Sequence, residues 1–563
     1  MLSSHLLVCC HFDIHSMQMD SRQLKDCDIQ ALLEGDNSDE DIICDNSDDD
    51  PDYVLQEFQN NEDSESENED MDQTVITNNI PANLAGASKS RNRLQQPDPR
   101  ALWNEVDAIP TLDVFNDISG VTDDFQLDVN SSVLDLFSYF VDNELIDMFK
   151  QQTNLYARQK LRKMRSSESL TVKSRMNEWK TVTLVEIKNF LAIIFHQSIS
   201  QRPQLIDHWS KDPTVASNYC PNVMSRNRFL LILSNFHLND NYLFKKRGEP
   251  GHDPLHKVRP LIDNIQRRFQ QAYLPGEKIT IDEGMCAFRG RLQFKQYMPQ
   301  KPNKYGIKLY MLSEADSGYV WNFSVFCGQS NVVINIVTNL LGSLSGAGRT
   351  LYTDRFYTSP ELARELEKIG TALVGTVMKN RRGLPREWKN LILQKGEQIF
   401  RRSENLLAIC WKDKRPVYML STRHTAQMIT YQTKRGTEKT KPACVLDYNQ
   451  NKAGVDLTDQ LMSYGVFDHK TVKWGKKLTF HCLLMSVVNA CILHNKVKGK
   501  KMSVTQFMKL LCTELPICEG DSPRQGSCGG QLGRLSTGNH FLEKNSNPSR
   551  KDKNTENVQS LLC

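Results

Sequence analysis

The chain has no run of 18 uninterrupted apolar residues, so we expect no membrane-spanning helix. The apolar stretch at residues 6–10 is too short for a signal-peptide core and has no basic residue before it, so no secretory signal is expected. The 15 cysteines include no Cys-x-x-Cys pair. Scattered cysteines of this kind favour free thiols in a reducing compartment over a disulfide framework.

Lysine and arginine are missing from residues 26–88, which contain 20 Asp or Glu. Because the 563-residue chain has a formal net charge of +3, the remainder carries +23. A segment so poor in apolar residues cannot offset the entropy of ordering, so region 1–110 is predicted to be disordered. It would act as a solubilising tail, compete with DNA for the basic body, or present Ser64 and Ser66 for phosphorylation. The basic body suits a nucleic-acid binder or an ordinary soluble basic protein.

Asp282 lies inside a run of β-branched residues. Alternating residues predict three antiparallel strands, at about 277–284, 305–312 and 319–326, with Asp282 on the first. Strand alternation would point Glu283 away from Asp282, so Glu283 is left out of the site. Glu314 and Asp316 are assigned to the hairpin turn.

Two later segments supply further acids. A short strand ends at Asp354, and a helix follows it with Ser359 as N-cap and Pro360 at its first position. Another helix opens at Gly454 and places Asp456 and Asp459 on one face. Acids at these places in strands and helix converge in ribonuclease H-like nucleotidyl transferases, where carboxylates hold two Mg²⁺ ions.

Over roughly residues 110–510 the chain resembles the piggyBac transposase family. The motifs that carry the resemblance are Asp282-Glu283, Phe288-Arg289-Gly290-Arg291, Tyr297-Met298-Pro299-Gln300-Lys301-Pro302-Asn303-Lys304-Tyr305-Gly306, Thr353-Asp354-Arg355-Phe356-Tyr357-Thr358, Val374-Gly375-Thr376 and Tyr448-Asn449-Gln450-Asn451-Lys452-Ala453-Gly454-Val455-Asp456. The resemblance implies a catalytic triad of Asp282, Asp354 and Asp456, with Asp459 as an accessory acid. These acids would bind Mg²⁺ or Mn²⁺.

The function implied by the resemblance is cut-and-paste transposition into TTAA targets. The implied partners are double-stranded DNA, as transposon ends and target, and a second copy of the chain, in the nucleus. Two alternatives remain: a domesticated sequence-specific DNA-binding or chromatin protein without transposition activity, and a Mg²⁺ nuclease that cuts without joining.

The predicted fold is an α/β ribonuclease H-like core, a mixed sheet with flanking helices, split by a β-rich insertion. A helical DNA-binding and dimerisation domain flanks the core. The predicted segments are the acidic region 1–110, the helical domain 111–262 and 458–512, the core 263–372 and 445–457, the insertion 373–444, and the tail 513–563.

Basic residues near the acids are predicted to contact DNA, although some of them would simply balance the acids. In the core these residues are Arg289, Arg291, Lys301, Lys304 and Lys308. Before the last long helix they are Lys470, Lys473 and Lys476 beside Trp474, which would stack on DNA or belong to the core. The basic cluster at residues 158–165 fits phosphate contacts or a solvated helix face equally.

Cysteine and histidine give no predicted metal site. His196 and His208 are isolated in sequence and are interpreted as structural or surface residues. Many members of the resembled family end in a cysteine-rich zinc module, but Cys512, Cys518, Cys528 and Cys563 lack the paired spacing that zinc needs. Zinc is therefore not expected, and autonomous recognition of element ends is in doubt.

Overall fold

The computed structural model describes residues 103–111, 113–299, 301, 303–328, 332–432, 436, 438–467, 471 and 473–517. Residues 103–110, the end of the region predicted to be disordered, are described, and Asn104 there pairs with Arg402. Residues 1–102, nearly all of the tail 513–563, and Lys470 lie outside the described residues. The predictions made for them stay predictions.

The first described part of the chain is helical, as predicted, and side-chain caps set where its helices begin. Thr183 and Glu186 form a capping box at the start of α4 (Leu184–Ile199), and Ser225 caps α6 (Arg226–Asn235). The other elements of this part are α2 (Val133–Phe140), α3 (Asn143–Ser166), α5 (Tyr219–Val223), α7 (Arg259–Ala272), η4 (Arg175–Glu178), η5 (Leu205–Trp209) and η6 (Asn241–Leu243).

A mixed sheet follows. The predicted antiparallel strands are confirmed as β3 (Lys278–Ala287), β5 (Tyr305–Glu314) and β6 (Val320–Val325). The predicted strand before Asp354 is β7 (Thr350–Thr353), which runs parallel to β3 and to β8 (Ala372–Thr376). The short strands are β1 (Gly120–Val121), β2 (Tyr273–Leu274) and β4 (Gln296–Tyr297).

The region predicted as an insertion continues the same sheet. Its strands are β9 (Gln398–Ser403), β10 (Leu406–Lys412), β11 (Pro416–Ser421), β12 (Met428–Gln432) and β13 (Glu438–Pro442). Strand β11 pairs with β8, so the sheet has the order β4-β5-β3-β7-β8-β11-β10-β9, with β6 on β5. Strands β12 and β13 form a separate hairpin. Strands β3 and β7, which lead to Asp282 and Asp354, therefore share one sheet with strands β9 to β11.

The remaining helices pack on this sheet or on the earlier helices. They are α8 (Val333–Leu341), α9 (Pro360–Lys368), α10 (Ala443–Asn451), α11 (Gly454–Ser463), α12 (Trp474–Lys498) and α13 (Val504–Glu514), with short turns η7 (Gly342–Leu344) and η8 (Arg386–Asn390). Ser359 caps α9 and Pro360 occupies its first turn, as predicted. Helix α11 begins at Gly454, also as predicted.

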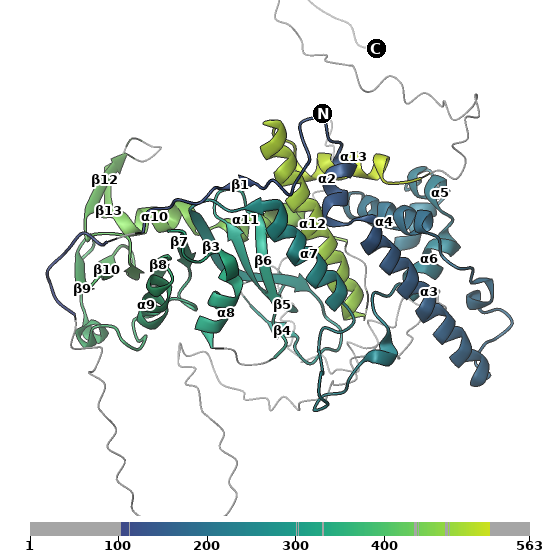
Figure 1. The fold of residues 1–563 in the computed structure, drawn as a ribbon, viewed down its shortest axis with the longest axis horizontal. Helices are drawn as coiled ribbons and strands as arrows, with labels where there is room; N and C mark the ends of the chain where they lie inside the picture. Colours follow the sequence, from purple (N-terminus) through teal and green to yellow (C-terminus); the bar gives the residue numbers. More distant parts are fainter. Residues whose placement is uncertain are drawn as a thin grey trace, which may run out of the picture. The chain divides into compact units, whose positions relative to one another are not determined.

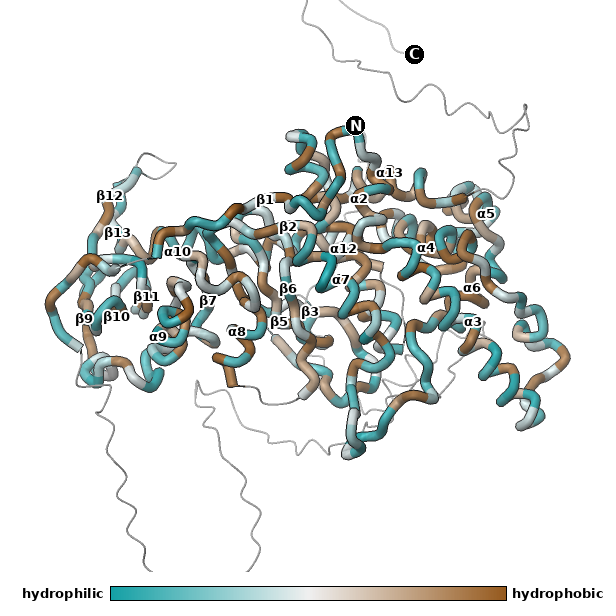
Figure 2. The backbone as a smooth tube through the Cα atoms, viewed as in Figure 1, coloured by the Kyte–Doolittle hydropathy of each residue, from teal (hydrophilic) through white to brown (hydrophobic). Residues whose placement is uncertain are grey.

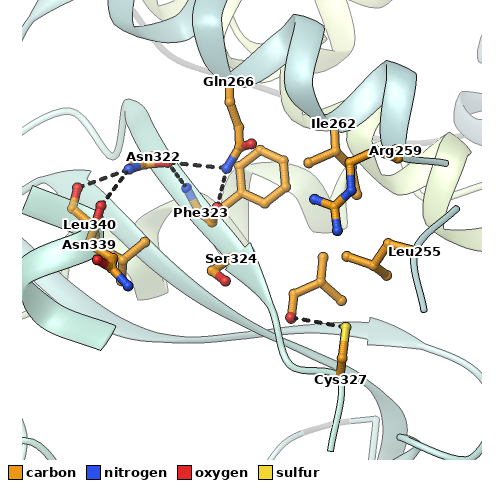
Figure 3. Close-up of a pocket in the computed structure, with 11 residues that line it drawn as sticks. Leu255, Arg259, Ile262, Gln266, Asn322, Phe323, Ser324, Cys327, Asn339 and Leu340 are labelled. Carbon is orange, nitrogen blue, oxygen red and sulfur yellow. Dashed lines mark hydrogen bonds between the residues drawn. The ribbon is translucent and has the colours of Figure 1, made fainter. Parts of the chain in front are cut away.

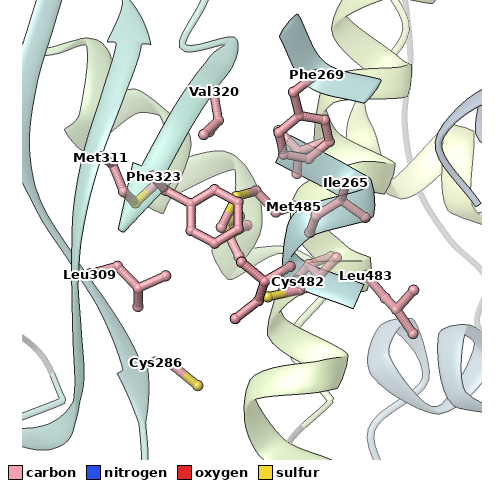
Figure 4. Close-up of a cluster of buried hydrophobic side chains, with 14 of the residues drawn as sticks. Ile265, Phe269, Cys286, Leu309, Met311, Val320, Phe323, Cys482, Leu483 and Met485 are labelled. Carbon is pink, nitrogen blue, oxygen red and sulfur yellow. The ribbon is translucent and has the colours of Figure 1, made fainter. Parts of the chain in front are cut away.

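Helix α12 joins the helical part to the sheet. It packs against α2 and α7 on one side and against β3 on the other (Figure 1). Figure 4 shows Cys482 and Met485 of α12 beside Phe269 of α7 and Phe323 of β6. Figure 2 shows hydrophobic residues along β3 and β5, the strands in this core. Among the described residues α12 is long and apolar enough to cross a membrane, but 89% of that window is buried inside the protein, as expected of a core helix.

A buried ion pair ties α12 to the strand hairpin. Glu314 is 5% exposed and accepts hydrogen bonds from Tyr273 Oη at 2.6 Å and Lys496 Nζ at 2.9 Å. Assigning Glu314 to the turn was wrong, because the turn starts after it and tertiary packing buries its side chain. Asp316 does lie exposed in the turn.

Candidate active site

The ends of two parallel strands bring Asp282 and Asp354 together. Pairing between β3 and β7 runs from Lys278 opposite Thr350 to Ile281 opposite Thr353. Asp282 and Asp354 are the next residues on the two strands. Oxygen atoms of Asp282, Glu283 and Asp354 all lie within 4.8 Å of one another.

Glu283 belongs to this group, contrary to the prediction from strand alternation. Because β7 ends opposite Ile281, no strand covers this edge of β3 beyond that point. The Asp282 carboxylate turns back to accept a 2.8 Å hydrogen bond from the Glu283 amide. The Glu283 carboxylate accepts from Tyr357 Oη and pairs with Lys308 Nζ, both at 3.0 Å. Alternation sets the direction in which each Cβ leaves the strand, but it does not fix where a flexible carboxylate side chain ends.

Burial raises the pKa values of Asp282 and Asp354. Burial, with the nearby charges of Glu283 and Asp354, raises the pKa of Asp282 to about 8. The pKa of Asp354 is also raised, by burial and by Glu283, against hydrogen bonds from the Phe356 and Tyr357 amides. Acids held this close repel one another when ionised, so the group favours a bound proton or cation.

The other two predicted acids lie on α11 around a lysine. Lys301 Nζ is 3.5 Å from Asp459 Oδ2 and 3.9 Å from Asp456 Oδ1. Burial raises the pKa of Asp459 to about 6, although Lys301 opposes this. The Asp456 side chain is 64% exposed. Within the described residues, the group of acids within 4.8 Å contains neither Asp456 nor Asp459.

Charge nevertheless links the two groups of acids. Burial opposes protonation of Lys301, but Asp459, Asp282 and Asp456 together raise its pKa. Burial and the charges of Asp354, Asp282 and Asp456 raise the pKa of Tyr448, on α10, to about 12. Tyr448 is thus near acids of three segments, β3, β7 and α11, and Lys301 is near acids of two, β3 and α11.

Sequence reasoning did not assign Tyr448 or Tyr357 to the site. Both lie in stretches quoted for the family resemblance, and that was their only signal. Tyr357 is 1% exposed and orients Glu283, while Tyr448 lies among the acids of β3, β7 and α11.

The predicted DNA-contacting residues fall into different environments. Arg289, Arg291 and Lys304 are exposed on the segments next to β3 and β5. Lys308 is inside the site, paired with Glu283, and its side chain is 14% exposed. Exposed arginines and lysine remain suited to phosphate contacts, whereas Lys308 serves the carboxylate group.

Two predicted DNA contacts near α12 are wrong. Trp474 is 3% exposed and packs edge-to-face on Phe294, with ring centroids 5.6 Å apart. Lys476 is 8% exposed, and its Nζ donates to the backbone oxygens of Leu233 and Ser234 at the end of α6. Tertiary packing of α12 against the earlier helices buries both, which local sequence does not reveal. Lys473 is half-buried at the N-cap of α12.

Replacing Lys476 with methionine is expected to lower the free energy of unfolding by about 1–3 kcal/mol, because two buried carbonyl oxygens lose their donor. Affinity for DNA is expected to stay unchanged. Thermal melts and fluorescence anisotropy with a DNA duplex would measure the two effects. In the control Lys304→Met, stability should hold and DNA binding should weaken. Weaker binding by a fully stable Lys476→Met protein would contradict the assignment.

A cavity of about 280 Å³ lies away from the acids. It is bounded by α7, β6 and the end of α8 (Figure 3). The Gln266 amide points across it and donates to Asn322 Oδ1 at 3.2 Å and to the Phe323 carbonyl. Because these polar groups already satisfy one another, the cavity adds nothing to the chemistry of the acids.

The chain is similar in sequence and in fold to known proteins. A family model described as Transposase IS4 matches residues 132–491. PiggyBac transposable element-derived protein 3 of Homo sapiens is 24% identical over 467 residues, covering 77% of this chain and 74% of that protein. PiggyBac transposable element-derived protein 5 of Homo sapiens is 23% identical over 467 residues, covering 78% and 83%. A solved piggyBac transposase synaptic complex with hairpin DNA matches with a TM-score of 0.62 and 28% identity, covering 71% of this chain and 83% of that one.

Proposed function

Because the chain belongs to the piggyBac transposase family, we propose that it is a metal-dependent DNA transposase that cleaves and joins phosphodiester bonds. The observation that carries the proposal is the meeting of Asp282, Glu283 and Asp354 where β3 and β7 separate. Partly buried carboxylates this close together raise one another's pKa values, and such groups are concentrated at functional sites.

The residues present fit a divalent cation. Carboxylate oxygens are the ligands that Mg²⁺ and Mn²⁺ prefer, and the raised pKa values of Asp282 and Asp354 reflect charge that a cation would neutralise. Asp282, Asp354 and Asp456 would hold the metal, with Asp459 beside them. When bound, Mg²⁺ supplies Lewis acidity that activates a water or a DNA 3′-hydroxyl and stabilises the leaving oxygen.

The chain's own side chains would prepare this site. Lys308 and Tyr357 fix the Glu283 carboxylate beside Asp282. The Lys301 ammonium pairs with Asp456 and Asp459 and offsets their negative charge on α11. Exposed Arg289, Arg291 and Lys304 would bind the phosphates flanking the scissile bond.

The substrate and the oligomeric state of this chain are proposed from its family membership. The solved relative is a synaptic complex with hairpin DNA. For this chain we propose double-stranded transposon ends and TTAA targets as substrates, action as a homodimer, and a nuclear location.

Incubating the full chain with Mg²⁺ and duplexes that carry candidate terminal repeats from the flanking DNA tests the proposal. Expected products are nicks at the repeat ends and strand transfer into TTAA-containing DNA. Cutting without transfer would instead support a nuclease. A folded chain that binds the repeats but neither cuts nor joins them would overturn the proposal.

The second candidate is a domesticated DNA-binding or chromatin protein. It is favoured by the human relatives, which are named as transposable element-derived proteins. The exposed Asp456 and its ion pair with Lys301 also suit a scaffold in which this acid no longer serves chemistry. Plasmid excision with matching element ends separates the two, because only a transposase restores the donor site.

Adding saturating Mg²⁺ at pH 8 is expected to raise the melting temperature by about 2–4 °C, because the cation binds the folded cluster and not the unfolded chain. At pH 5 protons compete for the same oxygens, so a smaller shift is expected. Differential scanning fluorimetry without chelator measures both shifts. An equal shift at pH 8 in the Asp282→Asn variant would mean that the stabilising site lies elsewhere.

A further inference from the structure

Two histidines and a cysteine meet in the helical part, far in sequence from the acids. His196 lies near the end of α4, His208 in η5 and Cys220 in α5. One ligand atom from each lies within 4.8 Å of the other two. The prediction that His196 and His208 are isolated was wrong, because spacings of 12 residues give no local signal and only the packing of α4, η5 and α5 unites them.

The cluster is buried and incompletely hydrogen-bonded. Cys220 is 0% and His208 is 3% exposed. Within the described part of the chain, His208 Nδ1 has no hydrogen-bond partner. Leaving a buried polar atom unpaired is unfavourable, and a ligand bound at this nitrogen would satisfy it. The ring of His196 stacks on Tyr219, with centroids 4.2 Å apart, which fixes its orientation.

The spacing of the donors fits tetrahedral zinc. Cys220 Sγ and His196 Nδ1 are 3.6 Å apart. With Zn–S near 2.3 Å and Zn–N near 2.0–2.1 Å, two ligands of a tetrahedral ion lie about 3.6 Å apart. Thiolate and imidazole are also the donors that select zinc over Mg²⁺. The Cys220 and His196 donors therefore need little movement to bind the ion, and a ligand atom of His208 lies within 4.8 Å of both.

The surrounding charges are mixed. Arg202 lies close enough to act on all three donors: it opposes a cation but favours the Cys220 thiolate. Asp207 acts on His208 with the opposite sign. The thiol of Cys512, on α13, is a further neighbour of Cys220, and Tyr219 Oη donates to the Cys512 carbonyl at 2.6 Å.

We infer that Cys220, His196 and His208 form a structural Zn²⁺ site that pins η5 and α5 to α4. Binding forms one Zn–S and two Zn–N bonds and releases the Cys220 thiol proton to solvent. The fourth position is left for water. This site shares no residue with the group of acids, and it does not depend on the proposed function.

The test compares full-length variants made in zinc-containing medium. Metal content per chain is measured by inductively coupled plasma mass spectrometry after desalting, with folding checked by circular dichroism. Cys220→Ala and His208→Gln are each expected to contain one zinc equivalent less than the wild type. The matched control is Cys491→Ala, which removes another buried helical thiol and should keep the wild-type zinc content.

Substitution with cobalt provides a second measurement, which reports metal binding by the thiolate and not merely the packing of Cys220. Chelator-treated wild-type protein refilled with Co²⁺ should show a thiolate-to-cobalt absorption band that weakens in Cys220→Ala. Where Cys220→Ala does not fold, His208→Gln carries the comparison. Equal zinc content in the wild type and in a folded His208→Gln protein would overturn the inference and leave only a thiol–imidazole contact.

Discussion

Replacing Asp282 with asparagine is expected to abolish strand cleavage, lowering its rate by at least about a hundredfold. Loss of a residue that merely supports a metal ligand already costs roughly 10–100-fold, so loss of a ligand should cost more. The asparagine keeps the size of the side chain but removes the charge at the centre of the carboxylate group. DNA affinity is expected to persist, because the exposed cations that suit phosphate contacts lie on other residues.

Cleavage is measured with labelled duplexes in Mg²⁺, and binding by anisotropy with the same duplexes. Asp316→Asn is the matched control, since Asp316 is an exposed acid at the hairpin turn and its replacement is expected to leave cleavage and binding unchanged. Cleavage that survives in the Asp282→Asn variant would locate the chemistry at another centre.

The same substitution should stabilise the protein in alkaline solution without metal. The folded pKa of Asp282 is raised to about 8, so between pH 4 and 8 the folded chain binds a proton that the unfolded chain has released. Stability therefore falls as pH rises through this window, by about 1.4 kcal/mol per unit of pKa shift at most. The amide of the Asp282→Asn variant does not titrate, so its stability lacks this dependence. Thermal melts should find the variant more stable than the wild type at pH 8 and equal to it near pH 4.

Local chemistry in the sequence was enough for most elements. The capping box at Thr183 and Glu186, the Ser359 and Pro360 helix start, and the alternation of the strands around Asp282 all act within a few residues. Such signals do not depend on the rest of the fold, so the helices and strands they mark are present in the structure.

Features set by tertiary packing were missed. The Glu283 carboxylate is held in the group by Tyr357 and Lys308, which come from other segments and which the pattern of one strand cannot reveal. Trp474 and Lys476 look like a basic, aromatic DNA contact until α12 is packed against the earlier helices. The proximity of His196 to His208 and Cys220 was also missed, because the three residues lie on different elements. Sequence predicts which residues bear chemistry better than it predicts which of them meet.

Replacing Gly454 with alanine is expected to lower cleavage by about a hundredfold and to destabilise the fold by about 1–3 kcal/mol. Helix α11 starts at Gly454 and carries Asp456 and Asp459 against β3 and β5. A Cβ there would lie 2.8 Å from the Glu314 carbonyl oxygen and 3.1 Å from the Ala315 Cα. Both are backbone atoms that cannot rotate away, so α11 itself has to move.

The movement would separate the acids of α11 from those of β3 and β7, and a misplacement of about 1 Å can cost a hundredfold in rate. Gly475→Ala is the matched control, because Gly475 also lies in a first helical turn but its nearest neighbour is 3.6 Å from an added Cβ. That variant should cleave at the wild-type rate and melt at the same temperature or higher, since alanine favours a helix. If Gly454→Ala loses stability but cleaves normally when folded, the acids of α11 are not needed for the reaction, and Asp282, Glu283 and Asp354 alone form its centre.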